Sequence, residues 1–300
     1  MQPKEHPVVV GLGEVLWDLL PGGKQLGGAP ANFAYHAQAL GAAAYVVSCV
    51  GADDLGDEIL TRLDSLDLNR DHVAVDDEHP TGTVSVALDA DGKPQYAIHE
   101  NVAWDFIHPR PAMLGLAEMA DAVCFGSLAQ RSAVSRAAIR DFVAATREDC
   151  LRIFDVNLRQ HYFHIDTIAP GLTWATVLKL NDEELPVVAR LLSIDGTGEE
   201  ILGTLCRRFN LNLIALTKGG AGSLLFSPER RSIQPGLPVE IADTVGAGDA
   251  FTAVLAMGLL AGLDLDAINR HANRVACYVC SRHGATPAMP AELLQFTNCR

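Results

Sequence analysis

The sequence contains neither a long apolar run nor a cluster of basic residues. Its longest apolar stretch, Ala250–Leu263, is interrupted by Thr252 and two glycines and is shorter than the ~20 residues that cross a bilayer. Lys and Arg total 23 against 37 Asp and Glu, so the formal net charge is −14. Such an acidic chain is a poor match to nucleic acid or to an anionic membrane surface, and we expect neither as a partner.

The cysteines show no disulfide pattern. Seven of them are scattered over 300 residues, which fits reduced thiols better than a disulfide framework. Cys277 and Cys280 form a lone CxxC inside a helical pattern, without the second Cys or His pair that a zinc site needs. The N-terminus is polar, and the apolar run after it is too short for a signal peptide. We therefore expect a cytoplasmic protein.

Two familiar nucleotide-binding motifs are incomplete. Val8–Gly13 begins like a dinucleotide-binding fingerprint, but the third glycine of that fingerprint would fall at Leu16. The pairs Gly23-Lys24 and Gly92-Lys93 are not followed by the Ser or Thr of a P-loop. We therefore expect no NAD, and any ATP site must be built in another way.

The chain alternates between strand and helix patterns. Buried strands are predicted at Val8–Leu12, Tyr45–Val50, Ala122–Phe125, Arg152–Val156, Val177–Leu180 and Leu213–Thr217. Helices are predicted at Ala29–Leu40, Leu55–Leu63, Val134–Thr146, Asp182–Leu192, Glu199–Phe209, Asp249–Leu260 and Asp266–Arg282. This alternation favours a mainly parallel sheet with helices on both faces. We expect one domain over residues 1–300.

Two segments interrupt the alternation. Thr83–Leu88 and Gln95–Ile98 flank a turn signal at residues 89–93, which predicts an antiparallel hairpin. The Gly-rich stretch Gly22–Gly28 is a second segment that does not fit the core pattern. We expect these insertions, about residues 14–28 and 82–108, to form a small β lid whose open edges predict a homodimer through the lid. Ser227–Leu237 is expected to be a polar surface connection.

The most informative segment is Asp243–Phe251, where a loop becomes a helix. Unpaired backbone N–H groups at a helix start attract an anion, and Gly246 and Gly248 let a bulky anion approach the backbone. Asp249 follows directly, where its carboxylate can meet a substrate hydroxyl that faces a bound phosphate. The segment thus predicts phosphoryl transfer with Asp249 as the base, although Asp also occurs in ordinary first turns. The helix start is expected to lower the pKa of Asp249.

Other polar segments open helices or follow strands. Gly27–Asn32 is a second glycine-led helix entry, and Asp18 lies before it, so both could bind the hydroxyls of a small polar ligand. Asp155–Arg159 follows a strand, where Asn157 and Arg159 would either face a phosphate or cap the surface.

Two further segments follow strands and suggest a metal and a nucleotide. Asn181–Glu184 is either a helix start rich in acids or a Mg²⁺ site in which Glu184 acts through water. Thr217–Gly222 offers a flexible loop for a nucleotide.

Together, these segments resemble the ribokinase-like (PfkB) carbohydrate kinases from about Val8 to Pro290, and the openings Gly13–Pro21 and Gly27–Ala34 look most like fructokinases. The resemblance implies a ribokinase-like three-layer α/β/α fold with a mainly parallel central sheet and a small β lid. It also implies an enzyme that transfers the γ-phosphate of ATP, with Mg²⁺, to D-fructose to give fructose 6-phosphate. Other family substrates (ribose, 2-keto-3-deoxygluconate, a nucleoside or a sugar phosphate) and a non-catalytic sugar-binding relative stay open.

The resemblance also implies roles for individual residues. Asp249 would be the base, with Arg159 near the transferring phosphate and an anion hole formed by the N–H groups of Gly246, Ala247 and Gly248. The sugar would be held by Asp18, Gly28 and Asn32. The nucleotide side would be lined by Asn181, Glu184, Thr217, Gly219, Gly222 and Asn273, with Glu184 also serving Mg²⁺ through water. A monovalent cation such as K⁺ would lie at Asp243, Val245, Ser281 and Gly284.

Overall fold

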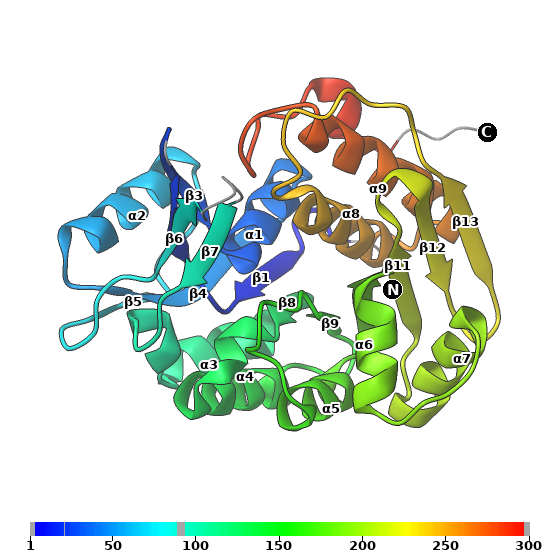
Figure 1. The fold of residues 1–300 in the computed structure, drawn as a ribbon, viewed down its shortest axis with the longest axis horizontal. Helices are drawn as coiled ribbons and strands as arrows, with labels where there is room; N and C mark the ends of the chain where they lie inside the picture. The colour runs from blue at the N-terminus through cyan, green and yellow to red at the C-terminus, as the bar shows by residue number, and fades with distance from the viewer. Residues whose placement is uncertain (1–3, 21, 89–93, 297–300) are drawn as a thin grey trace.

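The computed structural model describes residues 4–20, 22–88 and 94–296. Within them, the largest element is a nine-stranded sheet with the order β13-β12-β11-β10-β9-β8-β1-β4-β5 (Figure 1). Its strands are β1 (Val8–Leu12), β4 (Ala43–Gly51), β5 (Val73–Asp76), β8 (Ala122–Gly126), β9 (Leu151–Asp155), β10 (Val177–Asn181), β11 (Leu213–Thr217), β12 (Gly222–Phe226) and β13 (Arg231–Pro235).

Most of this sheet is parallel. Every neighbouring pair from β5 to β11 is parallel, and the β11–β12 and β12–β13 pairs at the far edge are antiparallel. The chain first builds β1, β4 and β5 in one direction and then returns to place β8 on the other side of β1. The order of the strands therefore reverses between β1 and β8. Ligands of open α/β sheets gather at the carboxyl ends of the strands beside such a reversal.

Helices cover both faces of the sheet, as its parallel strands require. One face carries α1 (Ala29–Ala39), α2 (Asp54–Ser65), α8 (Ala247–Leu260) and α9 (Leu265–Cys280), and the other carries α3 (Pro111–Met119), α4 (Ala133–Ala145), α5 (Ile165–Trp174), α6 (Glu184–Leu191) and α7 (Gly198–Phe209) (Figure 1). Short 3₁₀ turns lie at η1 (Ala103–Phe106), η2 (Leu128–Arg131), η3 (Gly219–Ala221) and η4 (Ala291–Leu293).

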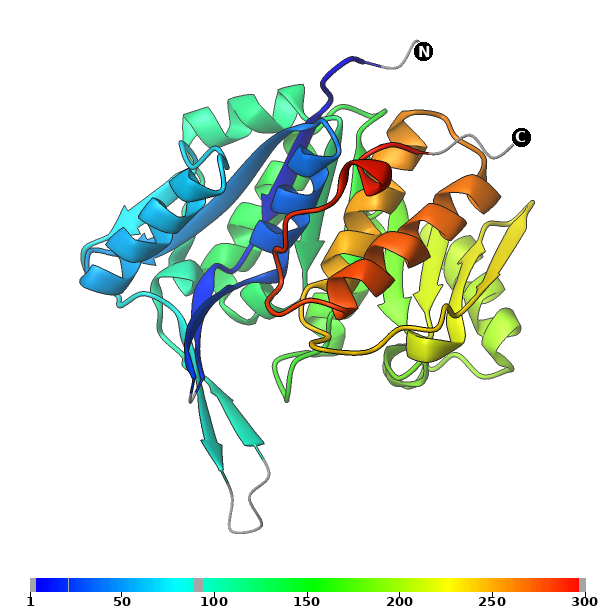
Figure 2. The same ribbon diagram turned by 90° about the horizontal axis from the view of Figure 1, so that it is seen from above.

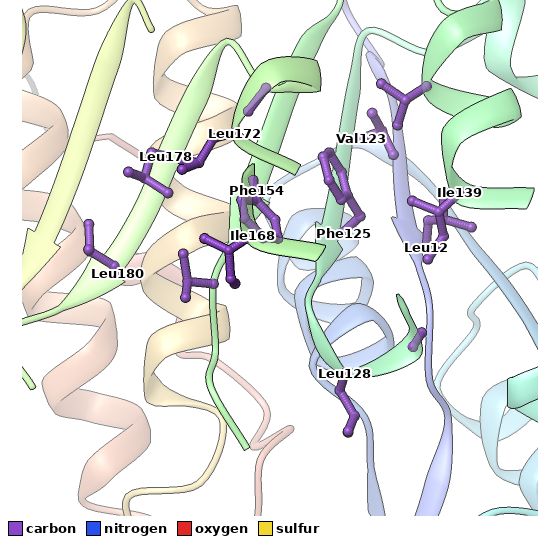
Figure 3. Packing of buried hydrophobic residues seen from close by; sticks show 14 of the residues in the cluster. Leu12, Val123, Phe125, Leu128, Ile139, Phe154, Ile168, Leu172, Leu178 and Leu180 are labelled. Atoms are coloured by element: carbon purple, nitrogen blue, oxygen red, sulfur yellow. The ribbon is translucent and has the colours of Figure 1, made fainter. Parts of the chain in front are cut away.

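Aromatic stacking organises the core between the sheet and α3–α7. Phe125 and Phe154, on neighbouring strands, stack with their ring centroids 5.3 Å apart, and both are fully buried (Figure 3). Gly171 in α5 lies so close to Phe154 that a methyl group there would be 2.8 Å from the ring. Burying each such large side chain stabilises the fold by about 1.5–3 kcal/mol. The glycine therefore sets how closely α5 packs on the sheet.

A second, smaller sheet stands apart from the main one. It has the order β3-β2-β6-β7, with β2 (Leu16–Leu20), β3 (Gly23–Gly27), β6 (Thr83–Leu88) and β7 (Pro94–Ile98). The β6–β7 hairpin projects beyond the helices (Figure 2). The base of the sheet is fixed by Trp17, whose backbone N–H donates to Gly82 and whose indole N–H donates to the Leu55 carbonyl. The bond to Leu55 in α2 holds the small sheet against the core, and the bond to Gly82 joins β2 to the residue before β6.

The predicted fold class is confirmed, as is the hairpin at Thr83–Leu88 and Gln95–Ile98, whose turn at residues 89–93 lies outside the described residues. The prediction for Ser227–Leu237 is wrong, because Arg231–Pro235 pairs with β12 as strand β13. Strands β5 and β12 and helices α3 and α5 were not predicted. Among the described helices, none has both the length and the apolar character required to cross a membrane.

Candidate active site

The starts of two helices meet at the carboxyl edge of the sheet. Asn32, in the first turn of α1, donates a hydrogen bond of 2.8 Å from its Nδ2 to Oδ2 of Asp249, in the first turn of α8. The two helices pack directly on each other. The structure therefore joins the two glycine-led helix entries that the sequence pointed to separately.

The start of α8 presents unpaired backbone N–H groups. Gly246 is its N-cap, at φ 78°, and no described side chain caps this end. The Ala247 N–H makes only a long contact of 3.4 Å with the Thr244 carbonyl. A methyl group at Gly246 would lie 2.5 Å from the Ala285 carbonyl oxygen, so only glycine fits. A helix start in this state is suited to an anion.

A buried ion pair lies behind this helix start. Nζ of Lys179 is 3.1 Å from Oδ1 of Asp155, and both side chains are almost fully buried. Thr252 of α8 donates to the other oxygen of Asp155 over 3.3 Å. A methyl group at Gly248 would be 3.0 Å from Lys179 Nζ. The lysine ammonium therefore lies directly beside the predicted anion hole.

Lys179 was not predicted as a site residue. Burial alone would lower the pKa of its ammonium, but Asp155 and Glu184 raise that pKa above its ordinary value, so Lys179 stays charged. The signal was present in the sequence, because Lys179 is the charged residue within the otherwise apolar stretch Val177–Leu180. A charge in a buried strand needs a partner.

The prediction that the pKa of Asp249 is lowered is wrong. Burial and the neighbouring Asp155 raise the pKa of Asp249 from 3.8 to about 6, and hydrogen bonding to Asn32 and the charge of Lys179 only partly oppose this. Desolvation and a like charge thus outweigh the helix start, which was expected to lower the pKa. A carboxyl with a pKa near neutrality is better matched to proton abstraction than one of ordinary pKa.

Glu14 is a second buried acid that was not predicted. It follows β1, is 3% exposed, and its Oε2 has no hydrogen-bond partner among the described residues. Burial raises the pKa of Glu14 to about 7, while its own backbone N–H and the charge of Arg159 act in the opposite direction. The charges of Asp249 and Asp155 raise the pKa of Glu14 further.

The predicted sugar residues lie along the same edge. Gly28 begins α1 at φ 110°, and a methyl group there would be 2.4 Å from the Glu14 carbonyl oxygen. The Asp18 carboxylate lies close to Gly27, because a methyl group added to Gly27 would be 2.5 Å from Asp18 Oδ2. Burial raises the pKa of Asp18, and the charge of Arg159 opposes that rise. Arg159 thus acts on Glu14, Asp18 and Asp249 together.

Glu184 connects the ends of two strands. Its Oε1 accepts the Leu158 N–H and its Oε2 accepts the Asn181 N–H, each over 2.8 Å. Asn181 in turn caps α6 by accepting the backbone N–H groups of Glu183 and Glu184. Each carboxylate oxygen keeps a second lone pair, so Glu184 fits a Mg²⁺ ion held through water.

The predicted nucleotide residues fall into two groups. Gly219 and Gly222 lie in and after the 3₁₀ turn that follows Thr217, at φ 50° and φ 97°. Asn273, by contrast, is buried in α9, where its Nδ2 donates to Ser223 Oγ and to the backbone carbonyl of Asn269. The structure therefore brings Asn273 against the back of β12, and both of its amide hydrogens have acceptors inside the protein.

The predicted cation loop is held together by Asp243. Its two carboxylate oxygens accept the backbone N–H groups of Val245 and Gly284, over 3.0 and 3.1 Å. Ser281 Oγ donates instead to the Tyr278 carbonyl. In the part of the chain that the structure describes, no three His, Cys, Asp or Glu side chains cluster as metal ligands. A cation here would therefore be bound by Asp243 and backbone carbonyls.

Comparison with known proteins decides the family. The model of the pfkB family of carbohydrate kinases matches residues 22–292. The chain belongs to this family. It is 30% identical over 287 residues to a sugar kinase of Pyrococcus horikoshii, covering 92% of this chain and 88% of that protein. It is 27% identical over 311 residues to fructokinase-2 of Zea mays, with 94% and 91% covered.

Solved structures of pfkB relatives share the fold. The uncharacterized sugar kinase of Pyrococcus horikoshii superposes with a TM-score of 0.80 at 27% identity, covering 93% of each chain. The fructokinase of Vibrio cholerae O395, in its form with fructose, ADP and calcium bound, gives a TM-score of 0.79 at 26% identity, covering 96% of this chain and 98% of that one. The chain is therefore a sugar kinase of this family in fold and sequence.

Buried polar atoms without partners gather at this edge of the pfkB fold. Within the described residues, such atoms include Glu14 Oε2, Asn32 Oδ1, Ser127 Oγ, Gln130 Oε1 and Arg131 Nη1. All five residues lie at or just beyond the carboxyl ends of β1 and β8, or in the first turn of α1. The other four such atoms in the described part of the chain belong to His36, Ser48, Trp104 and His271. Buried polar groups are nearly always hydrogen-bonded in native proteins, so the five at this edge are typical of a ligand site.

Proposed function

We propose that the protein phosphorylates a free sugar, D-fructose at O6, with ATP as the phosphoryl donor. The observation that carries this proposal is the Asn32–Asp249 hydrogen bond at the uncapped start of α8. It combines a base of raised pKa with an anion-binding helix start in one place. Such a pair is suited to a reaction in which a hydroxyl loses a proton as it meets a phosphoryl group.

The sugar would lie between Asp18, Gly28 and Asn32, with the reacting hydroxyl toward Asp249. Asp249 would accept the proton of that hydroxyl, and Asn32 would hold the carboxylate in position. The N–H groups of Gly246, Ala247 and Gly248 would receive the negative charge that builds up on the transferring group.

Cationic groups would neutralise the phosphates. ATP with Mg²⁺ supplies the phosphoryl group, and Glu184 and Asn181 would orient the metal through water. Lys179, beside Gly248, would stabilise negative charge from behind the anion hole, and Arg159 would do so from the solvent side. Thr217, Gly219 and Gly222 would line the nucleotide, and a K⁺ ion at Asp243 would stiffen the loop that precedes α8.

The charges of the site favour a neutral sugar over an anionic one. Glu14, Asp18 and Asp249 lie on the sugar side, and the cation that acts on all three is Arg159. A sugar phosphate or sugar acid would add a further negative charge to this group, which is unfavourable at low dielectric. The names of the Zea mays and Vibrio cholerae relatives support fructose as the specific sugar.

The smaller sheet would serve as a lid within a single kinase domain. Asp18 lies on its strand β2, so a sugar bound to Asp18 would draw the small sheet onto the core. Closure would exclude water, which otherwise competes for the phosphoryl group. The outer strands β3 and β7 leave open edges, through which a second copy could pair to give a homodimer.

A coupled assay of ADP release over a panel of sugars tests the proposal. The panel is D-fructose, D-ribose, 2-keto-3-deoxygluconate, adenosine and fructose 6-phosphate, each with MgATP. The highest kcat/KM is expected for fructose, with fructose 6-phosphate among the poorest. A preference for another neutral sugar would correct only the substrate. Absence of sugar-dependent ADP release on every compound would overturn the kinase proposal for this chain.

A further inference from the structure

Glu14 occupies a position that the phosphoryl transfer itself does not require. It follows β1, at the edge where the strand order reverses between β1 and β8, and it is 3% exposed. Its backbone carbonyl lies against Gly28, the residue that begins the sugar-side helix α1. The residue is therefore buried, and its backbone packs against the start of the sugar-side helix.

The carboxyl group of Glu14 is only partly satisfied. Its own backbone N–H interacts with the group, but its Oε2 has no partner among the described residues. Leaving a buried polar oxygen without a hydrogen bond is costly, and apolar residues fill most buried positions of this sheet. A glutamate at this position is therefore best explained by a partner that arrives with the substrate.

A second unsatisfied acceptor belongs to Asn32, the residue that is hydrogen-bonded to Asp249. Asn32 uses its Nδ2 to donate to Asp249, but its Oδ1 has no partner and the residue is 3% exposed. Asn32 and Glu14 are joined through Gly28, whose carbonyl accepts the Asn32 N–H. Two buried acceptor oxygens without a partner among the described residues thus belong to segments that meet at Gly28, which suits adjacent hydroxyl groups on one molecule.

We propose that Glu14 binds the sugar directly, through a hydrogen bond between its free Oε2 and a sugar hydroxyl other than the one that is phosphorylated. This inference rests on the proposed sugar kinase function and deepens it by naming a residue that sets specificity. The ligand class is a neutral polyhydroxylated sugar with adjacent free hydroxyls. A deoxy sugar lacking the contacted hydroxyl leaves Oε2 unpaired and binds poorly.

The nature of the carboxyl group agrees with this role. With a pKa raised to about 7, Glu14 is present both as the neutral acid and as the carboxylate near neutral pH. A hydroxyl both donates and accepts, so it pairs with either form. An anionic group at the same place would meet the negative charge of Asp249 and Asp155 as well.

The test combines protein variants with substrate analogues. Glu14→Ala and Glu14→Gln are compared with wild type on fructose and on its 1-, 3- and 4-deoxy analogues. Glu118→Gln, an exposed glutamate on α3, is the control for loss of one charge. The expected result for Glu14→Ala is a fall in kcat/KM for fructose of at least 30-fold, with KM for ATP within threefold of wild type. The analogue that lacks the hydroxyl bound by Glu14 should already have a low kcat/KM with wild type, and Glu14→Ala should not lower that kcat/KM further.

An unchanged kcat/KM on one analogue only would show that Glu14 contacts the hydroxyl missing from that analogue, since a structural role would affect all analogues alike. If Glu14→Ala lowers kcat/KM by the same factor on every analogue, or raises KM for ATP equally, the inference is overturned. If Glu14→Ala does not fold, the isosteric Glu14→Gln carries the same comparison with a smaller expected loss. Calorimetric titration of wild type with fructose, without ATP, separates the two proposals. Binding without turnover overturns the kinase proposal alone and leaves Glu14 to be judged on the binding of the analogues.

Discussion

The Asn32 side chain donates a 2.8 Å hydrogen bond to the Asp249 carboxylate, across 217 residues of sequence. This contact joins the first turn of α1 to the first turn of α8. The carboxylate is buried near Asp155, and burial and that like charge raise its pKa to about 6, although the bond to Asn32 opposes the rise. The sugar-side and phosphate-side halves of the proposed site are thereby fixed relative to each other around one acid.

Activity should be lost as the pH falls through about 6. Asp249 must be ionised to accept a proton, and its pKa is raised to about 6. At pH 5, kcat/KM is therefore expected at about a tenth of its plateau. Initial rates between pH 4.5 and 8.5 measure this, with Glu14→Gln as a parallel sample so that titration of Glu14 does not overlap. A profile that stays flat down to pH 4.5 would show that Asp249 does not limit the reaction.

Asp249→Asn is expected to stabilise the folded protein at neutral and alkaline pH. The folded-state pKa of Asp249 is raised, so folding favours the protonated form, and the ionised wild type carries a cost above pH 6. Removing that charge should raise the free energy of unfolding by about 1–3 kcal/mol at pH 8. The difference should shrink as the pH falls and vanish near pH 4. Urea denaturation at both pH values measures it, and a destabilised Asp249→Asn at pH 8 would contradict it.

Lys179→Met should destabilise the protein by about 3–5 kcal/mol, because it leaves Asp155 buried without its counter-charge. The double variant Lys179→Met with Asp155→Asn removes both charges and should recover a large part of the stability. Chemical denaturation of both variants measures the coupling. Equal destabilisation of the single and double variants would show that the pair contributes through packing and not through charge.

Gly246→Ala should reduce both stability and turnover. The residue has φ 78°, and a methyl group would lie 2.5 Å from the Ala285 carbonyl oxygen, so the loop before α8 must shift. The matched control is Gly262→Ala, since Gly262 also has a positive φ, of 66°, but nothing within 4 Å of an added methyl group. The control should cost about 1 kcal/mol and leave kcat unchanged. Similar kcat values for both variants would argue against an anion hole at Gly246.

The fold could be predicted from the sequence where the hydrophobic pattern of a segment matches its burial in the folded protein. The strands around Val8–Leu12 and Leu213–Thr217 are short apolar runs, and helices such as α4 and α7 have clear apolar faces. Strand β13 could not be predicted, because Arg231–Pro235 is an edge strand whose side chains are largely exposed. It forms through backbone pairing with β12, which leaves little trace in hydrophobic pattern.

The site could be predicted only where glycine and acid mark a helix start. Asp249, Gly246 and Asn32 carry that local signal. Glu14 does not, because its importance lies in burial and in neighbours that are distant in sequence. Lys179 carries a different signal, a charge within an apolar strand, but its partner Asp155 is 24 residues away. The pKa of Asp249 was wrong for the same reason: the helix start is visible in the sequence, whereas Asp155, 94 residues earlier, is not visible as a neighbour.

The most direct test of the account is the turnover of Asp249→Ala with saturating fructose and MgATP. We expect kcat to fall by about 10²–10⁴-fold, the usual contribution of a positioned general base, while calorimetry still detects binding of nucleotide and sugar. A variant that keeps more than about a tenth of the wild-type kcat, a difference of less than roughly 1.4 kcal/mol in activation free energy, would contradict the assignment of Asp249 as the base.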